Sequence, residues 1–390
     1  MIFINALSWY LMISLAGWFV FPLAYRLFAF LPDRGFTLSR PLGMLLWGYA
    51  YWLLVSLHVL QNDAGGGLFA LFIMAALSVV ILRKGGWAEL RQWVKGKIRL
   101  VIAAEGVFLL AFGLWVIFRA AMPDASGTEK PMELAFINSI MRSPAFPPSD
   151  PWLSGYAISY YYFGYVMVAL LARMVAIPGS VAFNLGVAAW FALTGVAAYG
   201  ILYNLLALRS RIARPVKNLL APILAPFFIL VAGNFEGFLE MLHARGIFWN
   251  QGAGGTWQSG FWSWLDIQEL TQPPAQPLQW IPNRPTGIWW WRASRVLQDY
   301  ALDKSPREVI DEFPMFSYLL GDLHPHVLAM PFALLAVGFA LNIFLQLRAS
   351  SSGRISLTKW VKKPDFWVTA LALGGMAFLN TWDFPIYLGL

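Results

Sequence analysis

The sequence predicts an all-α, polytopic membrane protein of about eight transmembrane helices with one further juxtamembrane or re-entrant helix. Of its 390 residues, 59% are hydrophobic and 12% are charged, whereas a soluble domain has about 25% charged residues. The mean hydropathy is +0.59. Apolar runs of roughly 20 residues, the length that crosses a bilayer, recur along the chain. These observations exclude an ordinary soluble enzyme, and the lack of Cys excludes thiolate chemistry.

The apolar runs divide the chain into residues 1–98, a set of N-terminal transmembrane helices, and residues 99–390. The first run has no basic segment and no small-residue cleavage site, so it predicts a span and not a signal peptide. The last run reaches the C-terminus without a stop signal, so we expect the chain to be part of a longer protein. The runs lie at 6–30, 41–60, 66–82, 99–122, 158–177, 180–206, 218–234, 327–347 and 366–388.

Basic loops predict the orientation. Lys and Arg cluster at 83–99, 207–217 and 348–363, and more weakly at 31–40 through Arg34 and Arg40. The positive-inside rule places these loops in the cytoplasm and the N-terminus outside the cell membrane. This bias accounts for the net charge of +8, so no nucleic-acid partner is expected.

The number of apolar runs between two of these basic loops conflicts with placing both loops in the cytoplasm. Three apolar runs separate 83–99 from 207–217, but both loops lie inside only if two of the runs cross. The run 158–177 opens with an aromatic cluster and carries Arg173, so we predict that it does not cross. It would be an amphipathic helix on the outer leaflet or a re-entrant segment. Eight spans remain, with large outer loops at 123–179 and 235–326.

Two carboxylates in the first outer loop are candidate catalytic residues. Glu129 and Glu133 are four residues apart, on either side of Pro131. If Pro131 begins a helix, as its fixed φ favours, Glu133 lies in the first turn. A carboxylate there could act as general base on an acceptor hydroxyl. The alternative is a solvated helix start that the helix dipole stabilises.

A second polar group precedes the run 327–347. Asp322, His324 and His326 lie within five residues of one another and could ligate a metal or bind a phosphate. The alternative is a polar cap on the span. Because ionisable residues at membrane depth are costly and usually functional, we expect substrate binding here. No metal is required, although a divalent metal is compatible with these residues.

Other candidates lie on the same predicted outer face. Loop 235–315 is rich in Trp, which anchors loops at the headgroups. It carries Arg284, Arg292 and Arg295, and Arg binds phosphate bidentately. We predict phosphate binding by Arg284 and Arg292. Asp383, in the outer half of the last span, is a further substrate-binding candidate. Glu105 lies near the cytoplasmic end of its span, where it could snorkel or pair with a basic residue.

Five motifs follow one another from about residue 100 to the end: Glu129-Lys-Pro-Met-Glu133, Phe146-Pro-Pro-Ser-Asp-Pro-Trp152, Tyr160-Tyr-Tyr-Phe-Gly-Tyr165, Gly321-Asp-Leu-His-Pro-His326 and Thr381-Trp-Asp-Phe384. In this order they resemble the YYY membrane proteins, an uncharacterised family of archaea and Chloroflexi. The layout also resembles the GT-C membrane glycosyltransferases, which take sugar from a polyprenyl-phosphate donor. Those enzymes usually carry their acidic loop after the first span. Here three further spans precede the span 99–122 that leads into that loop, and the acidic motif is not an Asp-Glu pair.

The resemblance implies an inverting GT-C glycosyltransferase acting on the non-cytoplasmic face. Glu129 or Glu133 would be the base, and His324 and His326 would hold the donor phosphate. Tyr160, Tyr161 and Tyr162 would line the lipid or sugar site. The partners would be a polyprenyl-phosphate sugar and membrane lipid.

Two other functions remain open. A transporter or flippase of a lipid-linked or polar solute would also carry Asp383 inside a span, but the sequence has no internal repeat and its polar residues favour one face. The third is a structural subunit of a larger membrane assembly.

Overall fold

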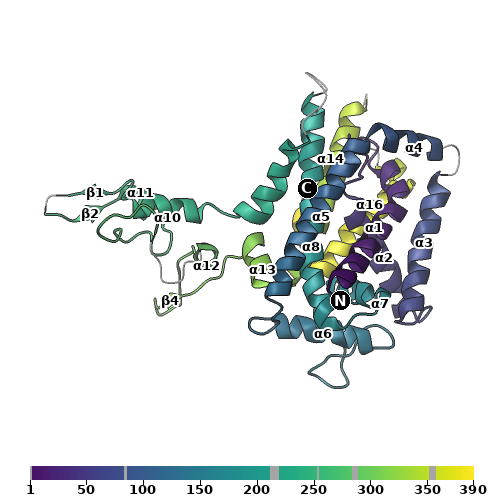
Figure 1. Cartoon of the computed structure of the whole chain (residues 1–390), viewed down its shortest axis with the longest axis horizontal. Coiled ribbons are helices and arrows are strands. Elements are labelled where there is room, and N and C mark those ends of the chain that lie inside the picture. Colours follow the sequence, from purple (N-terminus) through teal and green to yellow (C-terminus); the bar gives the residue numbers. More distant parts are fainter. Residues whose placement is uncertain (1, 83–85, 211–218, 253, 283–288, 351–356) are drawn as a thin grey trace. The chain divides into compact units, whose positions relative to one another are not determined.

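The computed structural model describes residues 2–82, 86–210, 219–252, 254–282, 289–350 and 357–390 (Figure 1). Among them the regular structure is helical apart from two short hairpins. The chain forms two compact units, Met1–Phe227 with Gly321–Leu390, and Phe228–Leu320. Each unit is described here by itself.

The first unit is a helical bundle around α8, whose apolar stretch is 89% buried. Small and aromatic side chains let neighbouring helices approach α8 closely, and Trp190 donates a hydrogen bond from Nε1 to the carbonyl of Leu328 at 2.8 Å. Its helices are α1 (Ile2–Leu27), α2 (Ser39–Ser56), α3 (Ala64–Leu82), α4 (Gly86–Gly96), α5 (Ile98–Ala121), α6 (Lys130–Arg142), α7 (Phe163–Met174), α8 (Gly179–Ser210), η1 (Ala221–Ile223), α9 (Leu224–Pro226), α14 (Pro325–Ala349), α15 (Leu357–Trp360), α16 (Pro364–Leu379) and α17 (Phe384–Gly389).

Five of the predicted spans are long and apolar enough to cross a membrane among the described residues. They are α1, α3, α5, α8 and α14, and a bent pair, Ala221–Ala232 with Glu236–Ala244, could make a sixth. The structure therefore shows a polytopic membrane protein with five or six candidate spans, and it does not show eight. A bend accounts for part of the difference, because the helical stretch Ala221–Ala232 ends at Gly233, which has φ +62°, and the chain resumes as Glu236–Ala244 at an angle of 68°.

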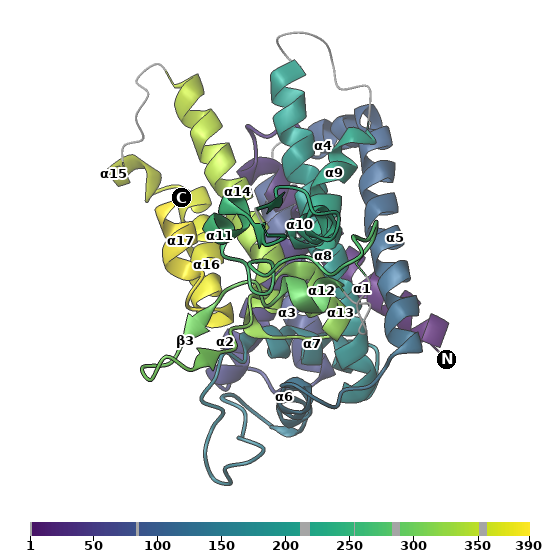
Figure 2. The same cartoon turned by 90° about the vertical axis from the view of Figure 1, so that its left-hand side faces the viewer.

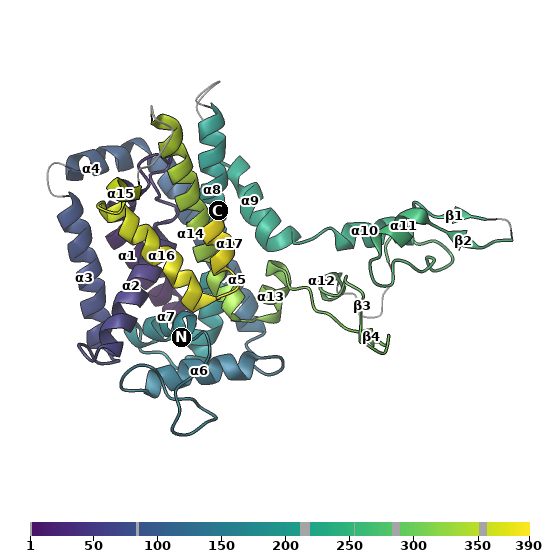
Figure 3. The same ribbon diagram turned by 180° about the vertical axis from the view of Figure 1, so that it is seen from behind.

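The last predicted span, 366–388, is also interrupted. Helix α16 has 16 residues and ends at Leu379, and the chain resumes as α17 after a break at Asn380 (Figure 3). The predicted span 41–60 is helical as α2, but this helix contains Ser39 and Arg40 and falls short of the hydropathy of the other five.

Helix α7 lies in the segment predicted not to cross. Its 12 residues give a length of about 18 Å, against about 30 Å of hydrocarbon. Ten of the 12 residues, from Phe163 to Ala172, are buried. An amphipathic helix on the leaflet surface would expose one face, whereas α7 is an interior helix of the bundle. Whether this segment is re-entrant stays a prediction. Helix α6, in contrast, lies across one end of the bundle (Figures 1 and 2).

The two ends of the first unit differ in their residues. The end nearer α6, here the α6 end, contains the first residues of α1, the turn at 57–63 and the start of α8 (Figure 1). Asn62 holds this end together, since its Nδ2 donates hydrogen bonds to the carbonyls of Ile140 and Ser143 at 2.6 and 2.5 Å. The opposite end contains residues 28–38 and α4. The predicted outer residues of the first unit gather at the α6 end; that this end faces outward stays a prediction.

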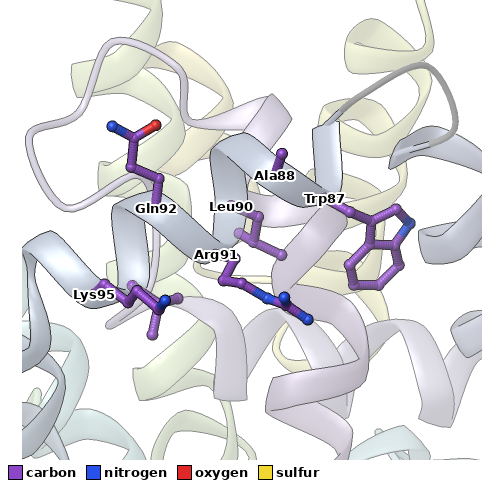
Figure 4. Close-up of a pocket in the computed structure, with 7 residues that line it drawn as sticks. Trp87, Ala88, Leu90, Arg91, Gln92 and Lys95 are labelled. Atoms are coloured by element: carbon purple, nitrogen blue, oxygen red, sulfur yellow. The ribbon is translucent and has the colours of Figure 1, made fainter.

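Helix α4 forms the clearest hollow at the opposite end. A space of about 1000 Å³ is lined by seven of its residues, among them Trp87, Arg91 and Lys95 (Figure 4). Among the described residues, no Asp, Glu or His lines it. This basic and aromatic lining fits a helix at a charged membrane surface, and it contains none of the candidate catalytic side chains.

An ion pair lies between α1, α2 and α5, with the Arg40 side chain 4% and the Glu105 side chain 21% exposed. Arg40 lies 2.5 Å from Glu105 and donates to the hydroxyl of Ser14 at 3.1 Å, while Tyr10 donates to Glu105 at 3.2 Å. The predicted pairing of Glu105 with a basic residue is confirmed. Arg40 was counted as a loop charge at 31–40, and that was wrong, because its side chain is buried in the bundle.

The second unit is small and has an aromatic core. Trp249, Trp262 and Leu270 form that core, whereas Trp264 and Trp280 are exposed and remain available as membrane anchors. Two antiparallel hairpins pair Asn250 with Gln258 and Asp299 with Arg307. Its elements are η2 (Phe227–Ala232), α10 (Glu236–Ala244), β1 (Asn250–Gln251), β2 (Trp257–Gln258), α11 (Gly260–Leu265), α12 (Trp289–Ala293), β3 (Asp299–Tyr300), β4 (Pro306–Arg307) and α13 (Pro314–Leu320).

Candidate functional site

Helix α6 positions the two glutamates of the first outer loop. It begins at Lys130 with Glu129 as N-cap and Pro131 in its first turn, so the predicted helix start is confirmed. The two side chains have opposite environments: that of Glu129 is 53% exposed, and that of Glu133 is fully buried. Phe136 and Ile140 lie on the buried face of α6, and they anchor the helix so that Glu133 points inward.

A tight loop brings the Asp–His motif to the same place. Gly321 has φ +77°, and a Cβ atom there would lie 2.1 Å from an Arg119 guanidinium nitrogen, so this position favours glycine. Asp322 follows and is buried. His324 is the N-cap of α14, and Pro325 opens the helix. The loop is joined to α6 by a hydrogen bond of 3.0 Å from the Leu323 N–H to Glu133 Oε2, across 190 residues of sequence.

His324 is surrounded by three carboxylates. Its Nδ1 lies 2.8 Å from Asp322 Oδ2 and 3.3 Å from Glu133 Oε1. Its Nε2 contacts Glu129 Oε2 on the other side of the ring. We call Glu129, Glu133, Asp322 and His324 the acidic–histidine cluster. The ring of His326 lies next to it, with its centroid 5.7 Å from that of His324.

The two buried carboxyls of the cluster differ in protonation. Burial raises the pKa of Glu133 to about 11, and the hydrogen bond and charge of Asp322 add to that rise. Burial also acts to raise the pKa of Asp322, but hydrogen bonds with His324 and Glu133 and the charges of His324 and His326 lower it overall. With no cation present, Glu133 is therefore neutral at pH 7 and Asp322 is the carboxylate. Of the two predicted bases, this favours Glu129.

The three consecutive tyrosines take different positions. Tyr160 lies beside the cluster: burial and then the charges of Glu129 and Glu133 raise its pKa to about 12. The ring centroid of Tyr161 is 5.4 Å from that of Tyr160. Tyr162 faces α2, where its hydroxyl accepts a hydrogen bond from Trp52 Nε1 at 3.2 Å. Tyr160 thus interacts with the acidic–histidine cluster, and the substrate-binding role of the three tyrosines stays a prediction.

The remaining predicted residue of the first unit, Asp383, follows the break between α16 and α17. It accepts a hydrogen bond from Asn380 Nδ2 at 3.1 Å and lies within electrostatic reach of His326. His326 thus interacts with Asp383 and also lies next to His324 of the acidic–histidine cluster.

The predicted arginines belong to the second unit. Arg284 lies outside the described residues. Arg292 Nε is 2.9 Å from Glu240 and 3.9 Å from Glu236, and its other end contacts Glu269. The Arg292 guanidinium thus contacts three carboxylates, and its predicted binding of phosphate stays a prediction. Arg295 pairs with Glu308 at 2.5 Å and covers the ring of Trp291.

One comparison with known proteins identifies a family. A family model matches residues 46–390. The chain belongs to the family described as uncharacterized membrane protein (DUF2298). The match includes the whole acidic–histidine cluster and extends to α2 and α3, beyond the region in which the sequence resembles the YYY proteins. It supports a multi-pass membrane protein, and its description names no activity. No curated protein and no solved structure matched the chain.

Sequence reasoning missed two residues at the cluster. Arg119, buried at the end of α5, donates from Nε to Asn184 at 2.9 Å and from its other end to the carbonyl of Asp124 at 3.2 Å, and it abuts Gly321. Its signal was a charge near the end of a predicted span. Tyr165 is fully buried, and its hydroxyl has no hydrogen-bond partner among the described residues. Its signal was the fourth tyrosine of the Tyr160–Tyr165 motif.

Proposed function

We propose that the chain is a membrane glycosyltransferase of GT-C type that uses a polyprenyl-phosphate-linked sugar on the non-cytoplasmic face. The observation that carries the proposal is the convergence of Glu129 and Glu133 with Asp322 and His324 at one end of a helical bundle. An ionisable cluster next to membrane-spanning helices is costly to maintain and is a functional-site candidate. The eight-span topology belongs to this proposal.

The reaction would be a single displacement with inversion. Glu129 takes the proton of the acceptor hydroxyl, the acceptor oxygen forms a bond to the anomeric carbon, and the bond from that carbon to the phosphate oxygen breaks. The electron pair of that bond leaves with the polyprenyl phosphate. Because phosphate is a good leaving group, the protein mainly has to orient the acceptor and remove its proton.

The neighbours of Glu129 have supporting roles in this proposal. His324 contacts Glu129 through Nε2 and Asp322 through Nδ1, so Asp322 fixes the orientation of the ring that fixes Glu129. His326 lies at the side of the cluster nearer Asp383 and would contact the leaving phosphate. Tyr160, with its raised pKa, remains a neutral hydroxyl that can donate a hydrogen bond to sugar or phosphate.

The test is transfer from a labelled polyprenyl-phosphate hexose in membranes containing the full chain. Product and released polyprenyl phosphate are both measured. Since a positioned general base contributes about 10²–10⁴-fold, Glu129→Gln should lower the rate by at least about a hundredfold. Glu89→Gln is the matched control, because Glu89 is exposed on α4. Full activity in Glu129→Gln would show that the base assignment is wrong.

One observation favours the second candidate, a transporter or flippase of a lipid-linked or polar solute. Helices broken at membrane depth line solute sites in transporters, and the pair Ala221–Ala232 with Glu236–Ala244 is bent in this way. The two candidates separate in the same membranes. A flippase moves the labelled lipid between leaflets with its glycosyl–phosphate bond intact, whereas a transferase releases polyprenyl phosphate.

A further inference from the structure

Three side chains of the acidic–histidine cluster are spaced as the ligands of one cation. One ligand atom each from Glu133, Asp322 and His324 all lie within 4.8 Å of one another. His324 Nδ1 is 2.8 Å from Asp322 Oδ2 and 3.3 Å from Glu133 Oε1. Two ligands at right angles around an ion, each about 2.1 Å away, are about 3 Å apart. The observed distances are those of neighbouring ligands in one coordination shell.

Outside the cluster itself, no described donor satisfies two of its carboxyl oxygens. Apart from the contact between the two acids, Glu133 Oε1 and Asp322 Oδ1 have no hydrogen-bond partner among the described residues, although Glu133 is 0% and Asp322 1% exposed. His324 Nδ1 carries at most one hydrogen and cannot donate fully to both carboxylates. A buried acceptor without a donor costs about 1–3 kcal/mol. A cation would satisfy both carboxylates at once.

We propose that Glu133, Asp322 and His324 bind one divalent transition-metal ion, with Mn²⁺ the best fit. Two carboxylates favour Mg²⁺, Ca²⁺ or Mn²⁺, while an imidazole favours first-row transition metals, and Mn²⁺ accepts both. Three protein ligands leave open coordination positions for water or for a phosphate oxygen. That these positions receive the donor phosphate rests on the proposed function; the binding of the ion does not.

Two further contacts hold the ligands in place. Glu129 contacts His324 Nε2, the ring nitrogen that faces away from the proposed ion. A carboxylate on the second ring nitrogen commonly fixes the orientation of a metal-binding His. The Leu323 N–H donates to Glu133 Oε2 at 3.0 Å, which leaves Oε1 as the ligand atom. Glu129 is accordingly a positioning residue for the ion and remains the base of the proposed transfer.

The experiment titrates the purified full chain with Mn²⁺ alone after chelator treatment, and free Mn²⁺ is measured by electron paramagnetic resonance. Wild type should bind one Mn²⁺ per chain. Asp322→Asn and His324→Gln each remove a ligand and should weaken Mn²⁺ binding by about tenfold or more. Glu129→Gln changes only the contact with His324 Nε2 and should weaken binding by about tenfold. Asp299→Asn, exposed on β3, and Glu89→Gln should leave the affinity unchanged.

Unfolding temperature supplies a second readout. Mn²⁺ should raise it for wild type and both controls, and not for Asp322→Asn or His324→Gln. Absence of saturable binding by wild type would overturn the proposal, and so would unchanged affinity in both ligand variants. Because no donor is present, the outcome is independent of transfer. If the chain binds Mn²⁺ but transfers no sugar, the proposed function is wrong and the metal site stands. If the chain binds no Mn²⁺ and still transfers sugar after chelation, the metal site is wrong and the proposed function stands.

Discussion

Replacing Gly321 with alanine should destabilise the first unit by about 2–4 kcal/mol, estimated from two costs. A left-handed φ, here +77°, costs a residue with a Cβ about 1–2 kcal/mol. The new Cβ would also lie 2.1 Å from Arg119, and the shift required would strain or break the 2.9 Å hydrogen bond to Asn184. A hydrogen bond to a charged group is worth about 1.5–3 kcal/mol, of which the flexible arginine would recover part.

Gly127→Ala is the matched control for that substitution. Gly127 has φ +73°, and a Cβ there would meet no heavy atom within 4 Å. It therefore carries the backbone cost alone, about 1–2 kcal/mol. Reversible unfolding in mixed micelles gives the free energy of unfolding of both variants. Equal losses would refute the reasoning, because the contact with Arg119 would then contribute nothing.

Two other predictions concern the bundle. Arg40→Met and Glu105→Gln should each cost about 3–5 kcal/mol, because each leaves its buried partner unpaired, whereas the double variant Arg40→Met/Glu105→Met should recover most of that loss; additive losses in the same micelle assay would contradict this. A reporter fused within 207–217 should read as cytoplasmic, since α7 is too short to cross. An external reading would mean that the segment around α7 crosses and that the predicted eight-span topology is wrong.

Proline residues made the first turns of α6 and α14 predictable. Pro131 and Pro325 each open a helix, so the positions of Glu133 and His324 relative to their helices followed from the sequence. The gathering of the acidic and histidine residues at one end followed from charge bias. The sequence could not show that Glu133 is buried and Glu129 exposed. That difference depends on how α6 packs against the loop around Leu323, which lies 190 residues further along the chain and donates a hydrogen bond to Glu133.

Span number was less predictable, for a different reason. Hydropathy windows count apolar residues and do not detect a break in the backbone. The segment 218–234 is apolar enough for a span, but its helical stretch Ala221–Ala232 ends at Gly233 and is bent by 68° from the next helix, Glu236–Ala244. The prediction for Arg40 failed for a related reason. Its charge suggested a loop residue, but the fold places its side chain beside Glu105 inside the bundle. Both errors arise where tertiary contacts override a local pattern.

The opposite environments of Glu129 and Glu133 explain how one helix start could serve two purposes. Four residues of spacing put both carboxyls on one face of α6, yet one of them meets solvent and the other meets Asp322. A base must exchange a proton with an incoming hydroxyl, which requires access, whereas a ligand must be held rigidly, which requires burial. His324 contacts both through different ring nitrogens. A substitution at His324 should therefore affect metal affinity and proton transfer together, whereas Glu129→Gln should reduce proton transfer far more than metal binding.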